Sequence, residues 1–247
     1  MKKILLIISY DGTGYHGYQV QGNLNTVEKR LDEAVSDLLG KETRVVGASR
    51  TDAKVHAYGA AAAFESGLMM PADRYKYALN ARLPGDIVVR ESLEVPMDFH
   101  PRYDSLGKVY EYRILNTKLP DPMLRNYAHF LYEDLDVAAM DEAAGYFEGR
   151  HDFVGFATKK KEVTDTVRTL SSCKVITEGD IITIRVEGEG FLYNMVRIIV
   201  GTLIRVGEGK IPPKAIPGII KSKDRSLAGP TAPPQGLYLM ETRYEWD

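Results

Sequence analysis

The sequence predicts an α+β fold made of two ferredoxin-like, βαββ-type halves that share an antiparallel sheet. Strand-like and helix-like hydrophobic patterns alternate along the 247 residues. Two strand-like segments, 168–177 and 181–187, are separated only by Glu178-Gly179-Asp180, a typical hairpin turn. Connections this short do not suit an all-parallel sheet, whose strands need long crossovers. We therefore expect a division near residue 105, into an N-terminal half, 1–105, and a C-terminal half, 106–247.

The first half combines a buried strand with an amphipathic helix. Residues 3–9 form a nearly continuous aliphatic run, which is typical of a strand buried on both faces. A helix is expected to start at Asn25, with Glu28 three residues later as in a capping box, and to stop at Gly40. The other elements expected here are strands at 44–47, 58–64 and 86–95 and a helix at 71–81.

The second half repeats this rhythm. A strand at 110–116 and a helix at 136–147 precede the hairpin, and a strand at 236–244 follows a loop rich in proline and glycine. The strongest amphipathic pattern predicts a helix over 192–206. Arg197 falls off the buried stripe of this helix, near its start, so its side chain is expected to be available for a site.

Charge and cysteine content narrow the class of protein. The net charge is −2, so nucleic-acid binding would depend on local basic surface rather than on the total. The single cysteine, Cys173, excludes an intramolecular disulfide and is expected to be a buried structural thiol. The apolar run at 4–8 is shorter than the roughly 7–15 residues of a signal peptide core. No run approaches the roughly 18 apolar residues of a spanning helix. We expect a cytoplasmic protein without a membrane segment.

Cofactor and metal motifs are not recognisable in the sequence. The five histidines lack zinc-type spacing, and no phosphate-binding glycine loop opens a helix. We expect neither a metal nor a cofactor.

Polar residues are densest in the segment 47–57, GASRTDAKVHA, which lies between two predicted strands. A loop on a rigid scaffold is a common position for catalytic side chains. Asp52 is the candidate carboxylate of this loop, although an aspartate in a loop is more often a turn former.

The segment resembles the active-site loop of the TruA family of tRNA pseudouridine synthases, usually written G-R-T-D-A-G-V-H-A. It differs at Ser49 and Lys54, which stand where the family has glycine. We expect Lys54 to disfavour a backbone conformation that glycine permits. Seven further blocks resemble the family in the same order: 10–19, 25–28, 79–87, 99–102, 108–113, 190–197 and 232–239.

The resemblance implies conversion of uridine to pseudouridine at positions 38, 39 and/or 40 of the tRNA anticodon stem-loop. The reaction breaks the N1–C1′ bond, turns the base and joins C5 to C1′, so it needs no redox cofactor and no ATP. It needs a nucleophile, and an ionised carboxylate can act as one, as in retaining glycosidases. The resemblance assigns this role to Asp52.

The resemblance also implies partners for Asp52. Arg197 is expected to be the cation beside it, and Tyr110 the aromatic ring that stacks on the uracil and assists removal of the C5 proton. Arg50 is expected to occupy or hold open the gap left when the uridine leaves the RNA stack. Because these residues come from both halves, we expect the active-site cleft to lie between them.

The expected partners are the anticodon arm of tRNA and a second copy of the chain, since the family acts as homodimers. The run Lys159-Lys160-Lys161 is a candidate for the basic rim that holds the RNA. Two other readings stay open. The chain could be a non-catalytic tRNA-binding or chaperone protein, or a glycoside hydrolase with Asp11 or Asp152 as its second acid.

Overall fold

The computed structural model describes residues 1–158 and 164–245, and the chain forms two compact units within it. The first unit contains Met1–Leu106 together with the last strand, from Tyr238 onward, and the second contains Gly107–Leu237. The division predicted from the sequence assigned residues 106–247 to one half. The C-terminal strand departs from this division because it pairs with a strand of the first unit.

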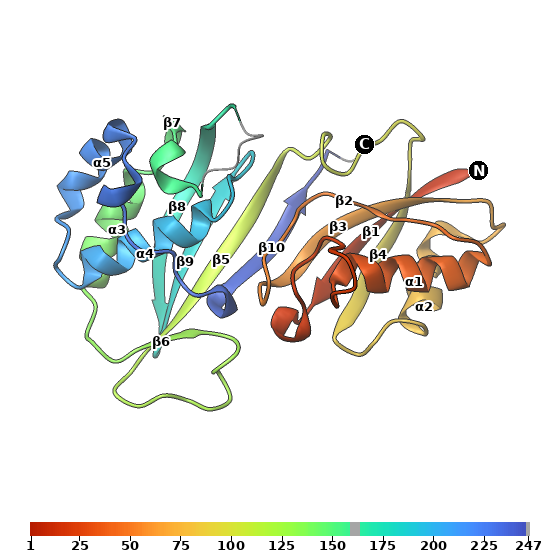
Figure 1. The fold of residues 1–247 in the computed structure, drawn as a ribbon, viewed down its shortest axis with the longest axis horizontal. Helices are drawn as coiled ribbons and strands as arrows, with labels where there is room; N and C mark the ends of the chain where they lie inside the picture. The colour runs from red at the N-terminus through yellow and green to blue at the C-terminus, as the bar shows by residue number, and fades with distance from the viewer. Residues whose placement is uncertain (159–163, 246–247) are drawn as a thin grey trace. The chain divides into compact units, whose positions relative to one another are not determined.

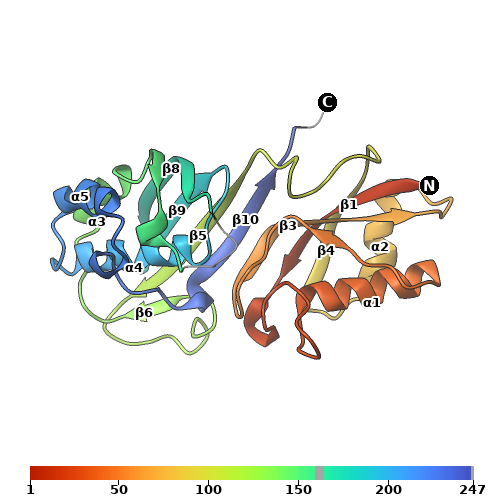
Figure 2. The same ribbon diagram turned by 45° about the horizontal axis from the view of Figure 1, so that its top comes forward.

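The first unit is a mostly antiparallel sheet with two helices that contact each other (Figures 1 and 2). The strand order is β4-β1-β3-β10, and β2 pairs with β3. Only β10 runs parallel to its neighbour β3. Its elements are β1 (Lys2–Tyr10), α1 (Val27–Leu39), β2 (Val46–Gly47), β3 (His56–Ser66), α2 (Tyr75–Asn80), β4 (Ile87–Val95) and β10 (Leu237–Arg243), with short 3-10 turns at Gly12–Gly14 and Ala72–Arg74.

The core of the first unit lies around β1, whose residues Ile4, Leu5 and Leu6 are fully buried. This burial on both faces explains the uninterrupted aliphatic run in the sequence. The helix α1 packs through one apolar stripe and ends at Gly40, which has φ 65° and donates its N–H to the carbonyl of Ser36. Glycine adopts this left-handed conformation without steric cost, so the predicted end is confirmed.

The predicted capping box at the start of α1 is wrong. The N-cap is Thr26, which makes no side-chain capping bond. The Glu28 carboxylate accepts from the Val20 N–H instead, over 2.7 Å. The Asn25 amide donates to the Gly14 carbonyl over 3.0 Å. Both side chains thus contact the preceding segment, and Asn25 also accepts from the Arg30 Nε of α1 over 3.0 Å.

The second unit is a sheet in the order β5-β9-β8-β7, with β6 parallel to β5 (Figure 1). The helices α3 and α4 contact each other, and they pack on β8 and β5 respectively. Its elements are β5 (Gly107–Asn116), β6 (His129–Leu131), α3 (Val137–Gly145), β7 (Gly149–Asp152), β8 (Val167–Glu178), β9 (Ile181–Gly188), α4 (Met195–Gly207) and α5 (Ile216–Ser222), with short 3-10 turns at Val154–Phe156, Pro213–Ala215, Arg225–Leu227 and Pro234–Gly236.

The predicted hairpin and the buried thiol of this unit are both confirmed. The strands β8 and β9 pair antiparallel, and Gly179 turns between them with φ 58°. Cys173 lies on β8 and is fully buried. Burial raises the pKa of its thiol to about 12, so it is an unreactive core residue. The candidate basic run Lys159-Lys160-Lys161 lies outside the described residues.

The α+β class and the mostly antiparallel sheets are confirmed, whereas the ferredoxin-like arrangement of two halves stays a prediction. Within the described residues, no helix combines the length and apolar character that crossing a membrane requires.

Candidate active site

Asp52 lies on the loop that joins β2 to β3 in the first unit. Buried residues anchor the loop on both sides, since Thr51 is 8% exposed and Val55 is 2% exposed. Between them Asp52 is half-buried, whereas Arg50 and Lys54 are exposed. The loop therefore carries one carboxylate on a buried base, flanked by two exposed cations.

Three hydrogen bonds from the end of β1 and the segment after it hold this loop. The hydroxyls of Tyr10 and Thr51 are both buried and lie 2.7 Å apart. The Tyr18 N–H donates to the Thr51 carbonyl over 3.0 Å, and the Lys54 N–H donates to the Tyr15 carbonyl over 3.2 Å. Because buried hydrogen bonds restrict the backbone, the residues on both sides of Asp52 are fixed in position.

Two glycines allow the segment to approach the loop this closely. A Cβ added at Gly12 would lie 2.0 Å from the carbonyl oxygen of Val55. Gly17 has φ 95°, and a Cβ there would lie 2.8 Å from the carbonyl oxygen of Thr51. Any larger residue would push the loop away, which gives Gly12 and Gly17 of the block 10–19 a physical reason.

His56 connects the end of the loop to the same segment. Its Nδ1 lies 3.1 Å from the Gly12 nitrogen and 3.1 Å from a carboxylate oxygen of Asp11. Neutral Nδ1 accepts from Gly12, whereas protonated Nδ1 donates to Asp11. The ring also stacks on Tyr238 at 4.8 Å, so the C-terminal strand contacts the residue at the end of the loop.

Lys54 occupies a turn position that normally favours glycine. The Val55 N–H donates to the Asp52 carbonyl over 3.2 Å, which closes a turn over 52–55. Lys54 has φ 66°, whereas Ala53 is not among the residues with positive φ. This is the φ pattern of a type II turn, whose third position prefers glycine. We expected Lys54 to disfavour a backbone conformation that glycine permits. The loop nevertheless adopts the left-handed conformation with lysine at this position.

Tyr110 lies on β5 of the second unit and is 8% exposed. Its ring meets that of Phe191 edge to face, with the centroids 5.1 Å apart. Phe191 precedes α4, so the tyrosine and the helix that carries Arg197 are linked through one aromatic contact. An aromatic pair of this kind holds the ring plane in a defined orientation.

Arg197 lies in the first turn of α4 and is half-buried. Its Nε donates to the Ala232 carbonyl over 2.7 Å, and its Nη1 donates to Asn194 over 3.0 Å. The Ala232 N–H donates in turn to the Arg197 carbonyl over 3.0 Å. The guanidinium is therefore oriented by the loop before β10 rather than extended into solvent.

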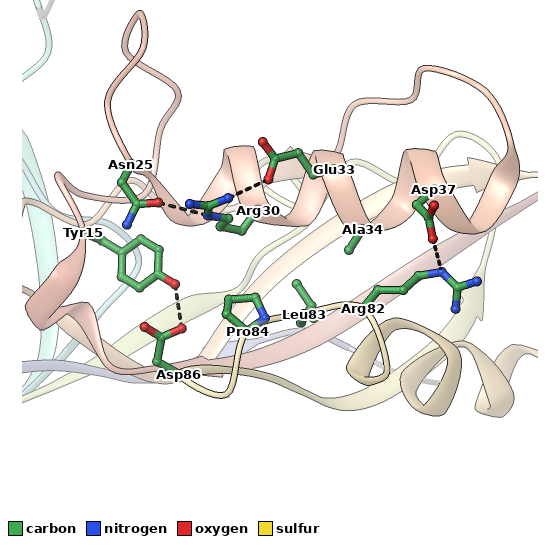
Figure 3. Close-up of a pocket in the computed structure, with 10 residues that line it drawn as sticks. All are labelled: Tyr15, Asn25, Arg30, Glu33, Ala34, Asp37, Arg82, Leu83, Pro84 and Asp86. Atoms are coloured by element: carbon green, nitrogen blue, oxygen red, sulfur yellow. Dashed lines mark hydrogen bonds and ion pairs between the residues drawn. The ribbon is translucent and has the colours of Figure 1, made fainter.

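A groove of about 700 Å³ lies between α1 and the connection from α2 to β4 (Figure 3). Both arginines that line it pair with carboxylates on α1. At one end the Tyr15 hydroxyl donates to Asp86 over 2.7 Å. Burial raises the pKa of Tyr15 well above its usual value, so this hydroxyl stays a donor. The groove thus fixes Tyr15, whose carbonyl accepts from the Lys54 N–H, and both of its arginines are paired with carboxylates.

The structure brings Asp52 and Arg50 together on one loop and places Tyr110 and Arg197 in the second unit. Sequence reasoning did not find the support given by Tyr10, Tyr18 and His56. The block 10–19 had marked this segment, but its role depends on pairing with residues some 40 positions away.

The sequence matches the family model described as tRNA pseudouridine synthase over residues 6–104 and 143–245. A tRNA pseudouridine synthase A from Ruminiclostridium cellulolyticum is 49% identical over 99% of this chain and 100% of its own length. Another from Acetivibrio thermocellus is 48% identical over 99% of this chain and 100% of its own. Among solved structures, a Cbf5-Nop10-Gar1 complex shows a TM-score of 0.35 and 14% identity, over 84% of this chain and 55% of that chain, which is too low a similarity to carry an argument.

Proposed function

We propose that this chain acts on one or more of positions 38, 39 and 40 in the anticodon stem-loop of tRNA. The chain belongs to the tRNA pseudouridine synthase family and so isomerises uridine to pseudouridine in tRNA. The observation that carries the proposal is the family match. It extends over both sides of the Asp52 loop, and relatives named tRNA pseudouridine synthase A match nearly the whole chain.

Asp52 is the nucleophile in this proposal. Its carboxylate bonds to the nucleoside while the N1–C1′ bond breaks and the base turns to present C5. Nothing enters or leaves the substrate, so the enzyme, an intramolecular transferase, needs no cofactor. The half-buried position of Asp52 and the buried bond between Tyr10 and Thr51 support a carboxylate held in one orientation.

Arg197 and Tyr110 serve the same uridine from the second unit. Arg197 supplies the positive charge that keeps the Asp52 carboxylate ionised once the substrate has displaced water. Tyr110 stacks on the uracil, and its hydroxyl assists transfer of the C5 proton. The fixed orientation of the Arg197 guanidinium and the edge-to-face packing of Tyr110 support these roles.

Arg50 helps the uridine base to reach the active site. A uridine paired or stacked in the anticodon stem must leave the helix before it can meet a carboxylate. Arg50 is exposed and two residues from Asp52, which supports a role in filling or holding open the vacated gap. The partner is the anticodon arm of tRNA, bound by a homodimer in the cytoplasm, where one tRNA contacts both protomers.

The test is incubation of unmodified tRNA transcript with the enzyme, followed by carbodiimide mapping of pseudouridine. The wild type is expected to convert at least one of positions 38, 39 and 40 without change in RNA mass. Asp52→Asn removes the charge at nearly constant size and is expected to lower the rate by about 10⁴-fold or more. Asp73→Asn, an exposed carboxylate of the same unit, is the matched control and keeps the wild-type rate.

Four outcomes contradict the proposal. Conversion confined to other positions overturns the site specificity. Full activity of Asp52→Asn overturns the assignment of the nucleophile. Binding of tRNA without any conversion indicates the non-catalytic reading, and release of free uracil indicates a glycoside hydrolase.

A further inference from the structure

Lys54 presents an exposed cation beside the candidate nucleophile. Its side chain is exposed, two residues after Asp52. Within residues 1–158 and 164–245, no hydrogen bond or ion pair involves its ammonium group. In the described part of the chain, the Lys54 ammonium group is therefore exposed and holds no carboxylate or carbonyl of the loop.

The backbone at Lys54 is strained, and glycine would relieve the strain. L-residues rarely adopt φ 66°, and this position of a type II turn favours glycine. Strain of this kind persists where the surrounding structure enforces it, and it concentrates at ligand-binding sites. Here the hydrogen bonds of Lys54 and Val55 enforce the turn. Because no hydrogen bond or ion pair of the side chain offsets the strain within the described residues, its benefit is expected to lie with a ligand.

We propose that Lys54 binds a phosphate of the tRNA backbone next to the uridine that Asp52 modifies, an inference that rests on the function proposed above. Lysine is a compact point charge with three donors, which suits a phosphate better than the edge of a base. Phosphate contacts provide affinity without reading sequence, so such a contact serves any tRNA that offers the anticodon arm.

Local charge explains why a cation is useful at this position. The Asp52 carboxylate must approach a polyanion, and two like charges repel as water is excluded. Within residues 50–54, Arg50 and Lys54 contribute two positive charges against the single negative charge of Asp52. The whole chain carries a net charge of −2, so this short segment is locally positive on a protein that is negative overall.

The experiment measures tRNA affinity across a range of salt concentrations for three variants. Lys54→Gln removes the charge and keeps a side chain of similar length, whereas Lys54→Arg keeps the charge. Lys41→Gln is the matched control. Lys41 is also exposed, lies just after the C-terminal end of α1, and has no side-chain hydrogen bond or ion pair in the described residues.

Lys54→Gln is expected to reduce the slope of log affinity against log salt by roughly one, which corresponds to one lost phosphate contact. Its KM for tRNA rises about threefold to tenfold at low salt, and kcat falls by less than about twofold. Lys54→Arg and Lys41→Gln keep the wild-type slope.

The inference is overturned if Lys54→Gln keeps the wild-type slope, if Lys54→Arg loses as much as Lys54→Gln, or if Lys41→Gln gives the same loss. A fall in kcat with an unchanged slope also overturns it, because Lys54 would then act on the chemistry. If the wild-type protein makes no pseudouridine, the proposed function is contradicted. The salt dependence of tRNA binding still tests the phosphate contact of Lys54, because it is measured without catalysis.

Discussion

The left-handed backbone at Lys54 makes a prediction about stability that is separate from RNA binding. An L-residue in this region costs about 1–2 kcal/mol, and glycine removes this cost. The greater freedom of glycine in the unfolded chain offsets about 0.4–1 kcal/mol of the gain. Lys54→Gly is therefore expected to raise the free energy of unfolding by about 1 kcal/mol, as measured by urea denaturation.

Lys54→Ala is the control for this measurement, because alanine removes the lysine side chain but keeps the Cβ that causes the strain. It is expected to leave the free energy of unfolding within about 0.5 kcal/mol of the wild type. If glycine and alanine changed stability equally, the strain would not be the cause.

Single residues also show how far the sequence predicts the site. The polar density of segment 47–57 and its resemblance to a family loop make Asp52 and Arg50 candidate site residues, because both are properties of neighbouring residues. The bond between the Tyr10 and Thr51 hydroxyls could not be predicted, since it joins residues 41 positions apart. Local patterns contain no information on which distant side chains meet in the folded chain.

At the scale of elements, Asp32 couples α1 to the chain before β2 and makes stability depend on pH. Its carboxylate accepts from the Val45 N–H over 2.7 Å. Burial raises the pKa of this carboxyl from 3.8 to about 6. A raised pKa means that the folded state holds a proton which the unfolded state releases above pH 3.8. The contribution of Asp32 to stability is therefore greatest below about pH 4 and is lost as the pH rises through 6.

Asp32→Asn is expected to remove this loss, because the amide oxygen of asparagine can still accept from Val45. The variant should be more stable than the wild type by about 1 kcal/mol at pH 8, a value reduced for the solvent around a half-buried group. The difference should shrink below pH 6 and vanish near pH 4. Denaturation of both proteins from pH 4 to 8 measures it, and a difference independent of pH would contradict the assigned cause.

Element boundaries were predictable where one residue type decides them, and not elsewhere. Gly40 ends α1 as expected, because a left-handed C-cap is a local requirement for glycine. The helix predicted over 192–206 starts later, at Met195, because Asn194 adopts φ 62° directly before it. The helix α5, Ile216–Ser222, was missed within the proline-rich loop. Its proline stands in the first turn, where the missing N–H costs nothing.

At the scale of the whole molecule, the first unit is built from two distant parts of the chain. The last strand, β10, returns to pair in parallel with β3, with Tyr238 opposite His56 and Leu239 opposite Ala57. Sequence patterns identified this strand but placed it in the second half, because a parallel pair between distant segments leaves no local signal. The strand that supports the Asp52 loop therefore lies far from that loop in the sequence.

Gly59 provides a test of this dependence. A Cβ at this position of β3 would lie 2.4 Å from the Met240 carbonyl oxygen, so alanine is expected to force β3 and β10 apart. Gly59→Ala should lower the stability of the first unit by about 1–3 kcal/mol. Gly85→Ala, where a Cβ would meet nothing within 4 Å, is the control.

Hydrogen exchange resolves where that loss falls. In Gly59→Ala, the amides of β3 and β10 should exchange faster, whereas those of the β8–β9 hairpin in the second unit should keep their protection. Pseudouridine formation should fall as well, because β10 carries the Tyr238 ring that stacks on His56 at the end of the Asp52 loop. Equal loss of protection in the hairpin would show that the two units unfold together, and that β10 is not specific to the support of the first.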